Sequence, residues 1–398
     1  MRTRPTPSST TSVPYVSNAP QPSAPVRVGV VGAGQLARMM GDEAHACAVQ
    51  LSVLAVSKDE PAVATADVVV LGEPTDPLAL ARLADGVDVV TFDHELVDLD
   101  QIDALEALGV VVRPSAAALR YAVDKAFQRR AFFEAGFAVP RFLVTDTSDD
   151  PRVATFLESI EGPPVLKVAR GGYDGRGVLF PRSHDEALSM IEELGTTVVI
   201  EERLRLDSEV AQVVVRGVDG SVRIYPLVTT VQSEGMCVEV RYPSGEDAAL
   251  EGRAAAIGER IAELTGAVGV VAIEFFVVAG ELLINEVALR PHNSGHWTIE
   301  GAATSQFANH LLAVSGQELG EVDTNAKCVV MVNIVGAKQP ASPEAARSVE
   351  GARVHDYGKA WRPGRKLGHV TALGDDPARV HVTAWNGARA YGTRTREA

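Results

Sequence analysis

The chain has 398 residues, 46% of them hydrophobic, and carries a formal net charge of −15 at pH 7. Since domains average about 150 residues, this length predicts two or three domains with a sizeable core. Because the charge is strongly negative and no long basic run occurs, we expect neither nucleic acid nor an anionic membrane as a partner.

The three cysteines, Cys47, Cys237 and Cys328, are far apart and lack the Cys-x-x-Cys spacing of zinc and redox sites. This usage indicates a reducing, cytoplasmic compartment and buried structural thiols. No apolar run approaches the roughly 18 residues of a membrane span.

Residues 1–25 contain six prolines among Ser and Thr and no acidic residue. This composition predicts a disordered leader. A transit peptide is the alternative, although the prolines oppose the amphipathic helix that it would need.

Residues 26–40 predict a buried strand, a glycine turn and a helix. The pattern Gly32-x-Gly34-x-x-Ala37 fits the dinucleotide fingerprint, in which helix amides hold a phosphate. That fingerprint requires an acidic residue at the end of the second strand, but strand 51–56 is followed by Ser57 and Lys58. An NAD-dependent oxidoreductase is therefore a rival hypothesis with weak support.

Further strands are predicted at 67–71, 87–92 and 110–112, alternating with helices at 77–83 and 99–108. Such alternation predicts a doubly wound parallel sheet. Ligands of these sheets bind at the carboxyl ends of strands, where the stretch 93–95, Asp-His-Glu, directly follows a strand.

Residues 164–178 predict a strand carrying Lys167, a loop with four glycines that contains Arg176, and a second strand. Glycines let backbone N–H groups approach a ligand, and the two cations add positive charge, so a polyphosphate is the expected guest. The lysine precedes the glycines, which excludes the Walker loop. A glycine-rich hairpin with ordinary surface charges is the alternative.

Residues 116–135 predict one helix with Lys125, Arg129 and Arg130 on a largely polar face, for which a charged exterior is the plain explanation. Helices are also predicted at 152–160 and 185–194, and a strand at 197–202 contains Glu201. Glu209 opens the next strand, 210–215. Two such carboxylates can recognise a purine amino group and a ribose, although two exposed glutamates would explain the pattern as well.

The hairpin of residues 271–287 carries the sharpest signal. A turn at Ala279-Gly280 places Glu274 and Glu286 opposite each other on one face of adjacent strands. Facing like charges are unfavourable and need compensation, which a Mg²⁺ ion shared with substrate phosphates supplies. A solvent-facing glutamate pair is the alternative. Asn285 falls on the other face unless a bulge turns it.

Two loops complete the pattern. Residues 288–298 combine Arg, His, Asn and Ser with loop-forming Pro and Gly, which favours a substrate loop over a zinc-binding helix. Residues 359–366 contain four cations in an otherwise acidic chain. They predict either a salt-bridged turn or, as the rarity of such clusters here favours, a pocket for a phosphate monoester.

With these motifs in place, the sequence resembles the ATP-grasp enzymes and, within them, the N5-carboxyaminoimidazole ribonucleotide synthetases. The resemblance covers about residues 26–385. It rests on five motifs in order: GAGQLARM at 32–39, GGYDGRG at 171–177, NE at 285–286, RPHNSGHW at 290–297 and RPGRKLGH at 362–369.

The resemblance implies an α/β ATP-grasp fold with a doubly wound parallel-sheet domain before it and a small β-rich part after it. The implied boundaries are a leader over 1–25, a pre-ATP-grasp domain over 26–122, an ATP-grasp domain over 123–317 and a C-terminal domain over 318–398. A lid over about 140–203 would close on ATP.

The resemblance also implies roles for individual residues. The implied nucleotide contacts are Lys125, Lys167, Gly172, Tyr173, Asp174, Gly175, Arg176, Gly177, Val178, Glu201, Glu202, Arg203, Leu204, Glu209, Gln232, Asn285 and Glu286. Glu274 and Glu286 would bind Mg²⁺, with Mn²⁺ as the other possible ion. The implied catalytic residues are Arg290, His292, Asn293 and Lys366. The implied substrate contacts are Gln35, Arg362, Arg365 and Lys366. Two positions depart from the family pattern, Gln232 in place of a histidine and Leu289 in place of a proline.

The implied reaction is the ATP- and bicarbonate-dependent carboxylation of 5-aminoimidazole ribonucleotide, with carboxyphosphate as the activated form of bicarbonate. The resemblance also implies a homodimer. Another ATP-grasp carboxylate–amine ligase would share every nucleotide residue and differ only in the loops 290–297 and 362–369. A nucleotide-sensing scaffold with a decayed site would be expected to lack Lys167, Glu274 or Glu286, all of which are present.

Overall fold

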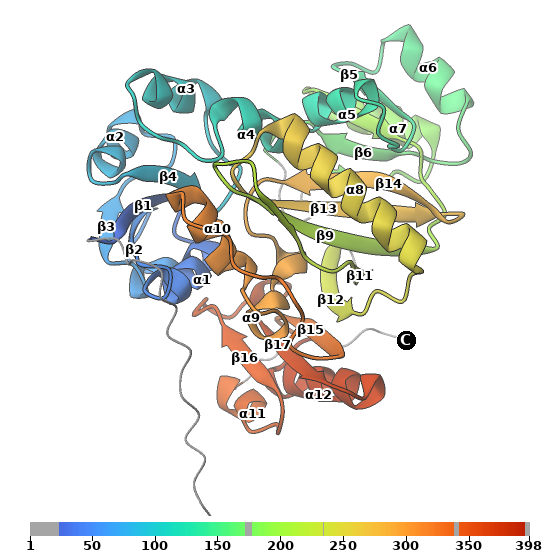
Figure 1. The fold of residues 1–398 in the computed structure, drawn as a ribbon. Coiled ribbons are helices and arrows are strands. Elements are labelled where there is room, and N and C mark those ends of the chain that lie inside the picture. The colour runs from blue at the N-terminus through green and yellow to red at the C-terminus, as the bar shows by residue number, and fades with distance from the viewer. Residues whose placement is uncertain (1–23, 172–176, 234, 338–341, 395–398) are drawn as a thin grey trace, which may run out of the picture.

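A computed structural model describes residues 24–171, 177–233, 235–337 and 342–394. Figure 1 shows a parallel-sheet domain beside a large sheet, a lid with its own helices above that sheet, and the C-terminal helices at the opposite end. The chain thus has the predicted ATP-grasp architecture. The leader residues 1–23 and the loop residues 172–176 lie outside the described residues.

The N-terminal sheet has the order β3-β2-β1-β4, and all its strands are parallel. Its strands are β1 (Val26–Val31), β2 (Val49–Ala55), β3 (Val68–Leu71) and β4 (Val89–Phe92). Its helical segments are α1 (Gln35–Ala44), η1 (Pro61–Ala64), α2 (Pro77–Asp85) and α3 (Leu99–Ala107). The strand predicted over 110–112 is wrong, because only Val112 forms an isolated bridge to Val90.

Helices cover both faces of this sheet, as the alternating pattern predicts. On one face α1 and the distant helix α10 (Gln306–Ser315) bury Met40 and Leu311 together, whereas α2 and α3 bury Leu83 and Ile102 on the other. The N-terminal domain therefore completes its core with a helix supplied from more than 200 residues later in the chain.

The helix predicted over 116–135 is in fact two helices, α4 (Ala116–Val123) and α5 (Lys125–Glu134). Asp124 between them has an extended backbone, and its carboxylate accepts a hydrogen bond from the Phe127 amide at 2.9 Å. An aspartate at this position is a favourable N-cap, so a new helix starts in a new direction. The break turns Lys125 and Arg129 inward and leaves only Arg130 exposed.

The lid is a four-stranded sheet of order β5-β8-β6-β7, covered by two helices. Its strands are β5 (Phe142–Thr145), β6 (Val165–Val168), β7 (Val178–Leu179) and β8 (Val198–Glu201). Its helices are α6 (Pro151–Glu158) and α7 (His184–Leu194). As predicted, the glycine loop joins two antiparallel strands, with Lys167 opposite Val178.

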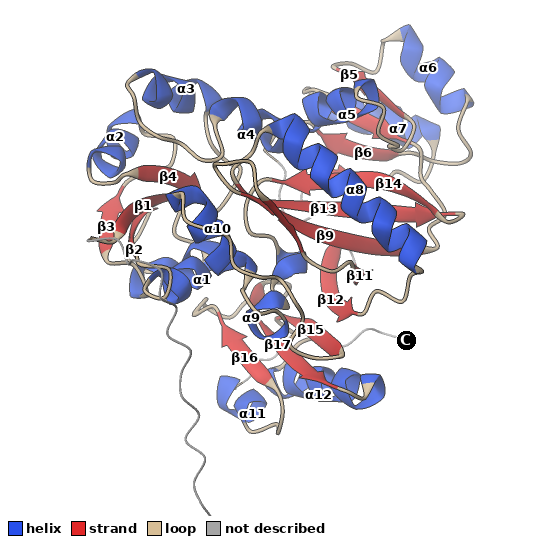
Figure 2. Ribbon diagram, in the orientation of Figure 1, coloured by secondary structure: helices blue, strands red, loops and turns tan. Residues whose placement is uncertain are grey.

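One large sheet, of order β14-β13-β9-β11-β12-β15-β17-β16, forms the base of the molecule (Figure 2). Its strands, together with β10 that pairs with β9, are β9 (Ser208–Arg216), β10 (Val222–Ile224), β11 (Val228–Ser233), β12 (Met236–Tyr242), β13 (Gly269–Val278), β14 (Glu281–Ala288), β15 (Cys328–Val335), β16 (Arg353–Asp356) and β17 (Lys366–Gly374). The remaining helical segments are α8 (Ala248–Thr265), η2 (Asn293–Gly295), α9 (Thr298–Gly301), α11 (Pro343–Arg347) and α12 (Pro377–Tyr391). The C-terminal strands continue the sheet of the central domain, because β15 pairs directly with β12.

The three cysteines are buried and reduced, as expected. Among the described residues, no helix combines the length and the apolarity that crossing a membrane requires.

His310 on α10 joins the two sheets. Its Nδ1 accepts a hydrogen bond from the Val270 amide at 3.1 Å, so the ring proton sits on Nε2, which donates to the Thr91 hydroxyl at 2.9 Å. Burial lowers the pKa of His310 to about 3. The unfolded chain therefore takes up a proton below about pH 6.5 that the native protein refuses.

We expect His310→Gln to reduce the acid sensitivity of folding, because glutamine can keep both hydrogen bonds without titrating. Between pH 7 and pH 5 the variant should lose ~2 kcal/mol less free energy of unfolding than the wild type. Urea unfolding at both pH values measures this difference, with the exposed His45→Gln as control. Equal losses in wild type and His310→Gln would contradict the assignment.

Candidate active site

The central feature of the site is the predicted hairpin. Glu274 on β13 pairs with Glu286 on β14, and Ala279 and Gly280 form the turn with positive φ angles of 50° and 77°. The next pair is Phe275 with Ile284, so Asn285 is an extra residue in β14. This bulge supplies the local change that a role for Asn285 in the site requires.

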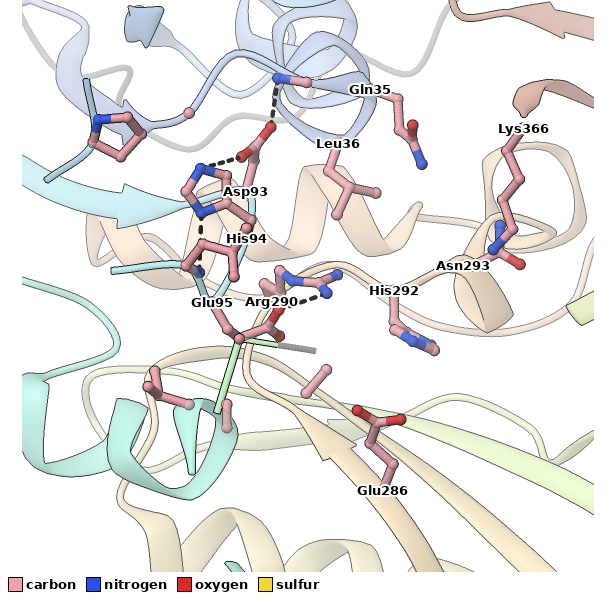
Figure 3. A pocket seen from close by; sticks show the side chains of 18 of the residues that line it. Gln35, Leu36, Asp93, His94, Glu95, Glu286, Arg290, His292, Asn293 and Lys366 are labelled. Carbon is pink, nitrogen blue, oxygen red and sulfur yellow. Dashed lines mark hydrogen bonds and ion pairs between the residues drawn. The ribbon is translucent and has the colours of Figure 1, made fainter. Parts of the chain in front are cut away.

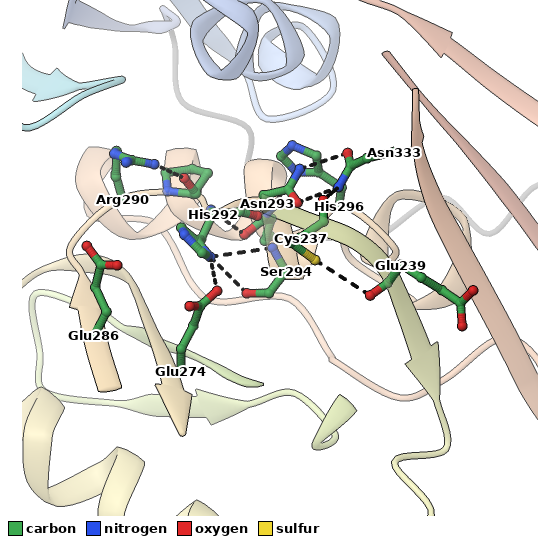
Figure 4. Close-up of polar contacts among 12 residues, drawn as sticks. Cys237, Glu239, Glu274, Glu286, Arg290, His292, Asn293, Ser294, His296 and Asn333 are labelled. Atoms are coloured by element: carbon green, nitrogen blue, oxygen red, sulfur yellow. Dashed lines mark hydrogen bonds and ion pairs between the residues drawn. The ribbon is translucent and has the colours of Figure 1, made fainter. Parts of the chain in front are cut away.

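The pKa values of the two hairpin carboxylates are shifted in opposite directions. Lys125 Nζ lies 2.5 Å from Glu286 Oε1, and this ammonium lowers the pKa of Glu286 to about 2. Burial, together with the neighbouring Glu286, raises the pKa of Glu274 to about 8. Figure 4 shows both side chains pointing toward the loop that carries Arg290 and His292. A bound cation would stabilise the ionised form of Glu274.

Glu274 and Glu286 can serve as ligands of Mg²⁺, provided that a bound substrate supplies further oxygen ligands. No group of three or more His, Cys, Asp or Glu side chains able to hold a metal occurs in the described parts of the chain. Mg²⁺ in nucleotide sites is typically held by one or two carboxylates plus phosphate oxygens and water. Glu274 and Glu286 provide the protein's share of that arrangement.

A cavity of about 390 Å³ lies between the lid and the large sheet. Val165, Val178, Phe180, Leu204 and Phe276 give it apolar walls. The polar residues that line it are Lys125, Lys167, Glu201, Glu202, Arg203, Glu209, Gln232, Glu274, Asn285 and Glu286. An apolar slot with a few polar groups suits a flat heterocycle attached to charged groups.

A buried charged cluster forms one wall of this cavity. Lys167 Nζ lies 2.9 Å from Glu201 Oε2 and donates to Asn285 Oδ1 at 2.9 Å. Burial opposes the charged form of Glu201, yet Arg129 and Lys167 together hold the pKa of Glu201 below its ordinary value. The bulge residue and the lid lysine predicted as phosphate contacts thus meet directly. Burial also raises the pKa of Glu209 to about 7.

A second cavity of about 360 Å³ lies between the N-terminal domain, the lid side and the C-terminal strands (Figure 3). Among the residues that line it are Gln35, Asp93, His94, Glu95, Arg290, His292, Asn293, Lys359 and Lys366. The two cavities share Lys125, Gln232, Gly235, Glu274 and Glu286 in their linings. The acidic hairpin therefore stands where the two cavities meet.

The loop 290–297 is held in the second cavity by contacts from several elements. Arg290 Nη2 lies 2.7 Å from Glu95 Oε2, which follows β4. His292 Nδ1 lies 2.9 Å from Ser294 Oγ and 3.8 Å from Glu274 Oε1. Asn293 and Asn333 exchange two amide hydrogen bonds, of 3.0 and 2.6 Å (Figure 4). The loop thus presents Arg290 and His292 beside the acidic hairpin.

The basic segment 359–366 enters the site only in part. Lys359, whose ammonium donates to Gln35 Oε1, and Lys366 line the second cavity. Arg362 is exposed and Arg365 donates to the Ala360 carbonyl at 3.1 Å, and neither is among the residues that line it. Their role as substrate contacts stays a prediction.

Sequence reasoning missed the roles of Lys359, Glu95 and Arg129. The position of Glu95 at the carboxyl end of a parallel strand was a usable signal, because ligands bind at that edge. Lys359 belonged to a recognised cluster, but its spacing does not show which cation faces inward. The face of Arg129 depended on the helix break at Asp124.

The glycine turn 32–34 packs closely against Asp93, which follows β4. Asp93 Oδ2 accepts a hydrogen bond from the Gly34 amide at 2.6 Å, and a Cβ on Gly32 would lie 2.0 Å from Asp93 Oδ1. The Gly34 amide, one of the groups that the NAD hypothesis assigned to a phosphate, thus has a carboxylate of the chain itself as its partner. The glycines are needed to accommodate Asp93.

We expect Gly34→Ala to destabilise the protein through its contact with Asp93, because the added Cβ would lie 2.8 Å from Asp93 Oδ2 while the backbone angles suit alanine. Asp93→Ala should remove this penalty. A double-mutant cycle of urea unfolding should therefore give a coupling of about 1–3 kcal/mol. Additive effects of the two substitutions would contradict this explanation of the glycine.

Three family descriptions match successive parts of the chain. The ribonucleotide synthetase preATP-grasp domain matches residues 26–123, and the ATP-grasp domain matches residues 130–307. The phosphoribosylaminoimidazole carboxylase C-terminal domain matches residues 329–383. Fold and site together place the chain in the ATP-grasp class.

The chain is similar to curated proteins over most of its length. The N5-carboxyaminoimidazole ribonucleotide synthase of Mycobacterium tuberculosis is 43% identical over 367 residues, which cover 89% of this chain and 85% of that protein. The protein of the same name from Synechococcus elongatus is 37% identical over 351 residues, covering 86% of this chain and 88% of that one. The chain belongs to the N5-carboxyaminoimidazole ribonucleotide synthase family.

Solved structures agree with this membership. The N5-carboxyaminoimidazole ribonucleotide synthetase of Thermus thermophilus superposes with a TM-score of 0.85 at 36% identity, covering 93% of this chain and 100% of that one. The N5-carboxyaminoimidazole synthase of Aspergillus clavatus, solved with ADP and 5-aminoimidazole ribonucleotide, gives a TM-score of 0.84 at 28% identity, covering 92% of this chain and 98% of that one.

Proposed function

We propose that this chain uses ATP to activate bicarbonate and transfers the carboxyl group to the exocyclic amine of 5-aminoimidazole ribonucleotide. One observation carries the proposal, namely that two cavities meet at Lys125, Glu274 and Glu286. A nucleotide in the first cavity would point its terminal phosphate at a substrate in the second. The family membership supports both substrates.

ATP is proposed to lie in the first cavity with its adenine between the apolar side chains of the lid and of β13. Lys167 and Lys125 would donate to phosphate oxygens, with Glu209 near the ribose. Glu274 and Glu286 would hold Mg²⁺, or Mn²⁺ in its place, which when bound offsets charge on the phosphates. The glycine loop 171–177, joined to Lys167 through β6, would cover the phosphates and exclude water.

Bicarbonate is proposed to bind between Arg290, His292 and the acidic hairpin. Its oxygen would attack the γ-phosphorus of ATP to give carboxyphosphate and ADP. The guanidinium of Arg290 would stabilise the negative charge that develops as carboxyphosphate forms. Glu95, whose Oε2 lies 2.7 Å from Arg290 Nη2, holds this guanidinium in place. His292 and Asn293 orient the carboxyl oxygens.

The ribonucleotide is proposed to occupy the rest of the second cavity. Lys359 and Lys366 would hold its phosphate monoester, and Gln35 would keep Lys359 in place by accepting its hydrogen bond. Arg362 and Arg365 would contact the substrate from the rim of the cavity. The exocyclic amine would then face the loop 290–297. It captures the carboxyl carbon, which gives the carbamate and releases phosphate.

The quaternary structure and compartment follow the family resemblance and the composition. We propose a homodimer in the cytoplasm, where reduced thiols such as Cys47, Cys237 and Cys328 persist. Light scattering coupled to gel filtration tests the assembly. A mass equal to the 42.1 kDa chain would contradict the dimer.

The function is tested by phosphate release from Mg·ATP and bicarbonate, with and without the ribonucleotide. We expect the ribonucleotide to stimulate release, and Glu286→Gln to lower kcat by about 100-fold or more, since it removes charge that offsets Lys125 and the metal. Release that ignores the ribonucleotide would leave an ATP-grasp ligase with another acceptor. No ATP consumption under any condition would return the scaffold hypothesis.

The substrate pocket is tested separately. Lys359→Met should raise the KM for the ribonucleotide about tenfold or more while leaving the KM for ATP unchanged, because one charge-assisted contact to the phosphate is lost. Arg362→Met, on the same segment but exposed, is the matched variant and should change this KM less. The reverse order of effects would assign the phosphate site to the rim arginines.

A further inference from the structure

Arg129 on α5 makes contacts that join both walls of the nucleotide cavity. Only 3% of its surface is exposed. Its Nε and Nη2 donate to Glu201 Oε1 at 2.9 and 2.5 Å, on the lid side. Its Nη1 donates to the Ile284 carbonyl at 2.6 Å and its Nη2 to the Asn285 carbonyl at 2.9 Å, on the side of the large sheet.

The two carbonyls that Arg129 contacts lie at the bulge of β14. A bulge disrupts the ladder of hydrogen bonds and needs other partners for its backbone groups. The planar guanidinium supplies donors to two successive carbonyls at once, which a lysine cannot do in the same geometry. Arg129 therefore fixes the conformation that turns the Asn285 side chain toward Lys167.

The charges of the cluster explain why an arginine is present. Glu201 alone would neutralise Lys167, whereas Arg129, Glu201 and Lys167 together carry one net positive charge. Lys167 lines the nucleotide cavity, and Arg129 is not among the lining residues. The surplus charge therefore faces the cavity through Lys167, where a polyphosphate would bind.

The cluster also fixes the direction of the lysine. An ammonium group has three N–H bonds. Glu201 Oε2 and Asn285 Oδ1 each lie 2.9 Å from Lys167 Nζ. These two acceptors leave the third N–H for a phosphate oxygen, in an orientation set by partners that Arg129 holds.

We propose that Arg129 is a positioning residue for ATP, which keeps the phosphate-binding Lys167 oriented and leaves the cluster of Arg129, Glu201 and Lys167 with one net positive charge. This inference rests on the proposed nucleotide site and goes beyond it by assigning a role to a residue that does not contact the ligand.

The test compares Arg129→Met and Arg129→Lys with Arg130→Met, the neighbouring exposed arginine on the same helix. Calorimetric binding of ADP and of a non-hydrolysable ATP analogue gives affinities without any turnover. We expect Arg129→Met to weaken both nucleotides about 10- to 100-fold, Arg129→Lys to weaken them less, and Arg130→Met to change neither. Steady-state kinetics should show a raised KM for ATP and an unchanged KM for the ribonucleotide.

A double variant distinguishes an effect of the cluster's charge on ATP affinity from a loss of structural support. Arg129→Met leaves the cluster with no net charge, whereas Arg129→Met combined with Glu201→Gln restores one positive charge on Lys167. The account predicts that the double variant binds ATP more tightly than Arg129→Met alone. A double variant that binds no more tightly than the single one, or unchanged ATP affinity in Arg129→Met, would overturn the inference.

Loss of stability gives a further check. If thermal unfolding shows that Arg129→Met does not fold, Arg129→Lys carries the comparison with Arg130→Met. Equal rises in KM for ATP and for the ribonucleotide would assign Arg129 a structural role and overturn the inference. Nucleotide binding by the wild type without any carboxylation would instead reject the proposed reaction and leave the test of Arg129 intact.

Discussion

The site depends on two glutamates that face each other across neighbouring strands. Glu274 and Glu286 are like charges on one face of a ladder, an arrangement that a sheet tolerates only with compensation. Lys125 supplies part of it from the start of α5, and we propose that a cation shared with substrate phosphates supplies the rest.

Helix α5 links this pair to the lid. Residues one turn apart on its inner face, Lys125 and Arg129, contact Glu286 and the bulge at Asn285 in succession, and Arg129 reaches on to Glu201. A single short helix therefore holds Glu286, Lys167 and the lid in fixed positions relative to one another. The aspartate that caps this helix, Asp124, therefore helps to determine where Lys125 and Arg129 lie.

Much of this could be predicted from sequence because it depends on local patterns. Alternation along 271–287 and the turn at Ala279-Gly280 predict the hairpin and its acidic residues. The regular register would place Glu274 opposite Asn285, and the bulge at Asn285 brings Glu286 opposite Glu274. The inward face of α5 could not be predicted, because Arg129 finds Glu201 at a separation of 72 residues. The partner of the glycine turn 32–34 could not be predicted for the same reason, since its carboxylate comes 59 residues later. Local sequence patterns specify the helices, strands and turns. Which charged groups pair with one another depends on the tertiary fold.

The central claim is that the two cavities carry out one reaction, in which ATP phosphorylates bicarbonate at their junction. The most direct measurement supplies ¹⁸O-labelled bicarbonate with Mg·ATP and 5-aminoimidazole ribonucleotide, and analyses the released phosphate by mass spectrometry. The account predicts one labelled oxygen per phosphate, because a bicarbonate oxygen becomes bonded to phosphorus. Unlabelled phosphate formed together with the carboxylated product would contradict it.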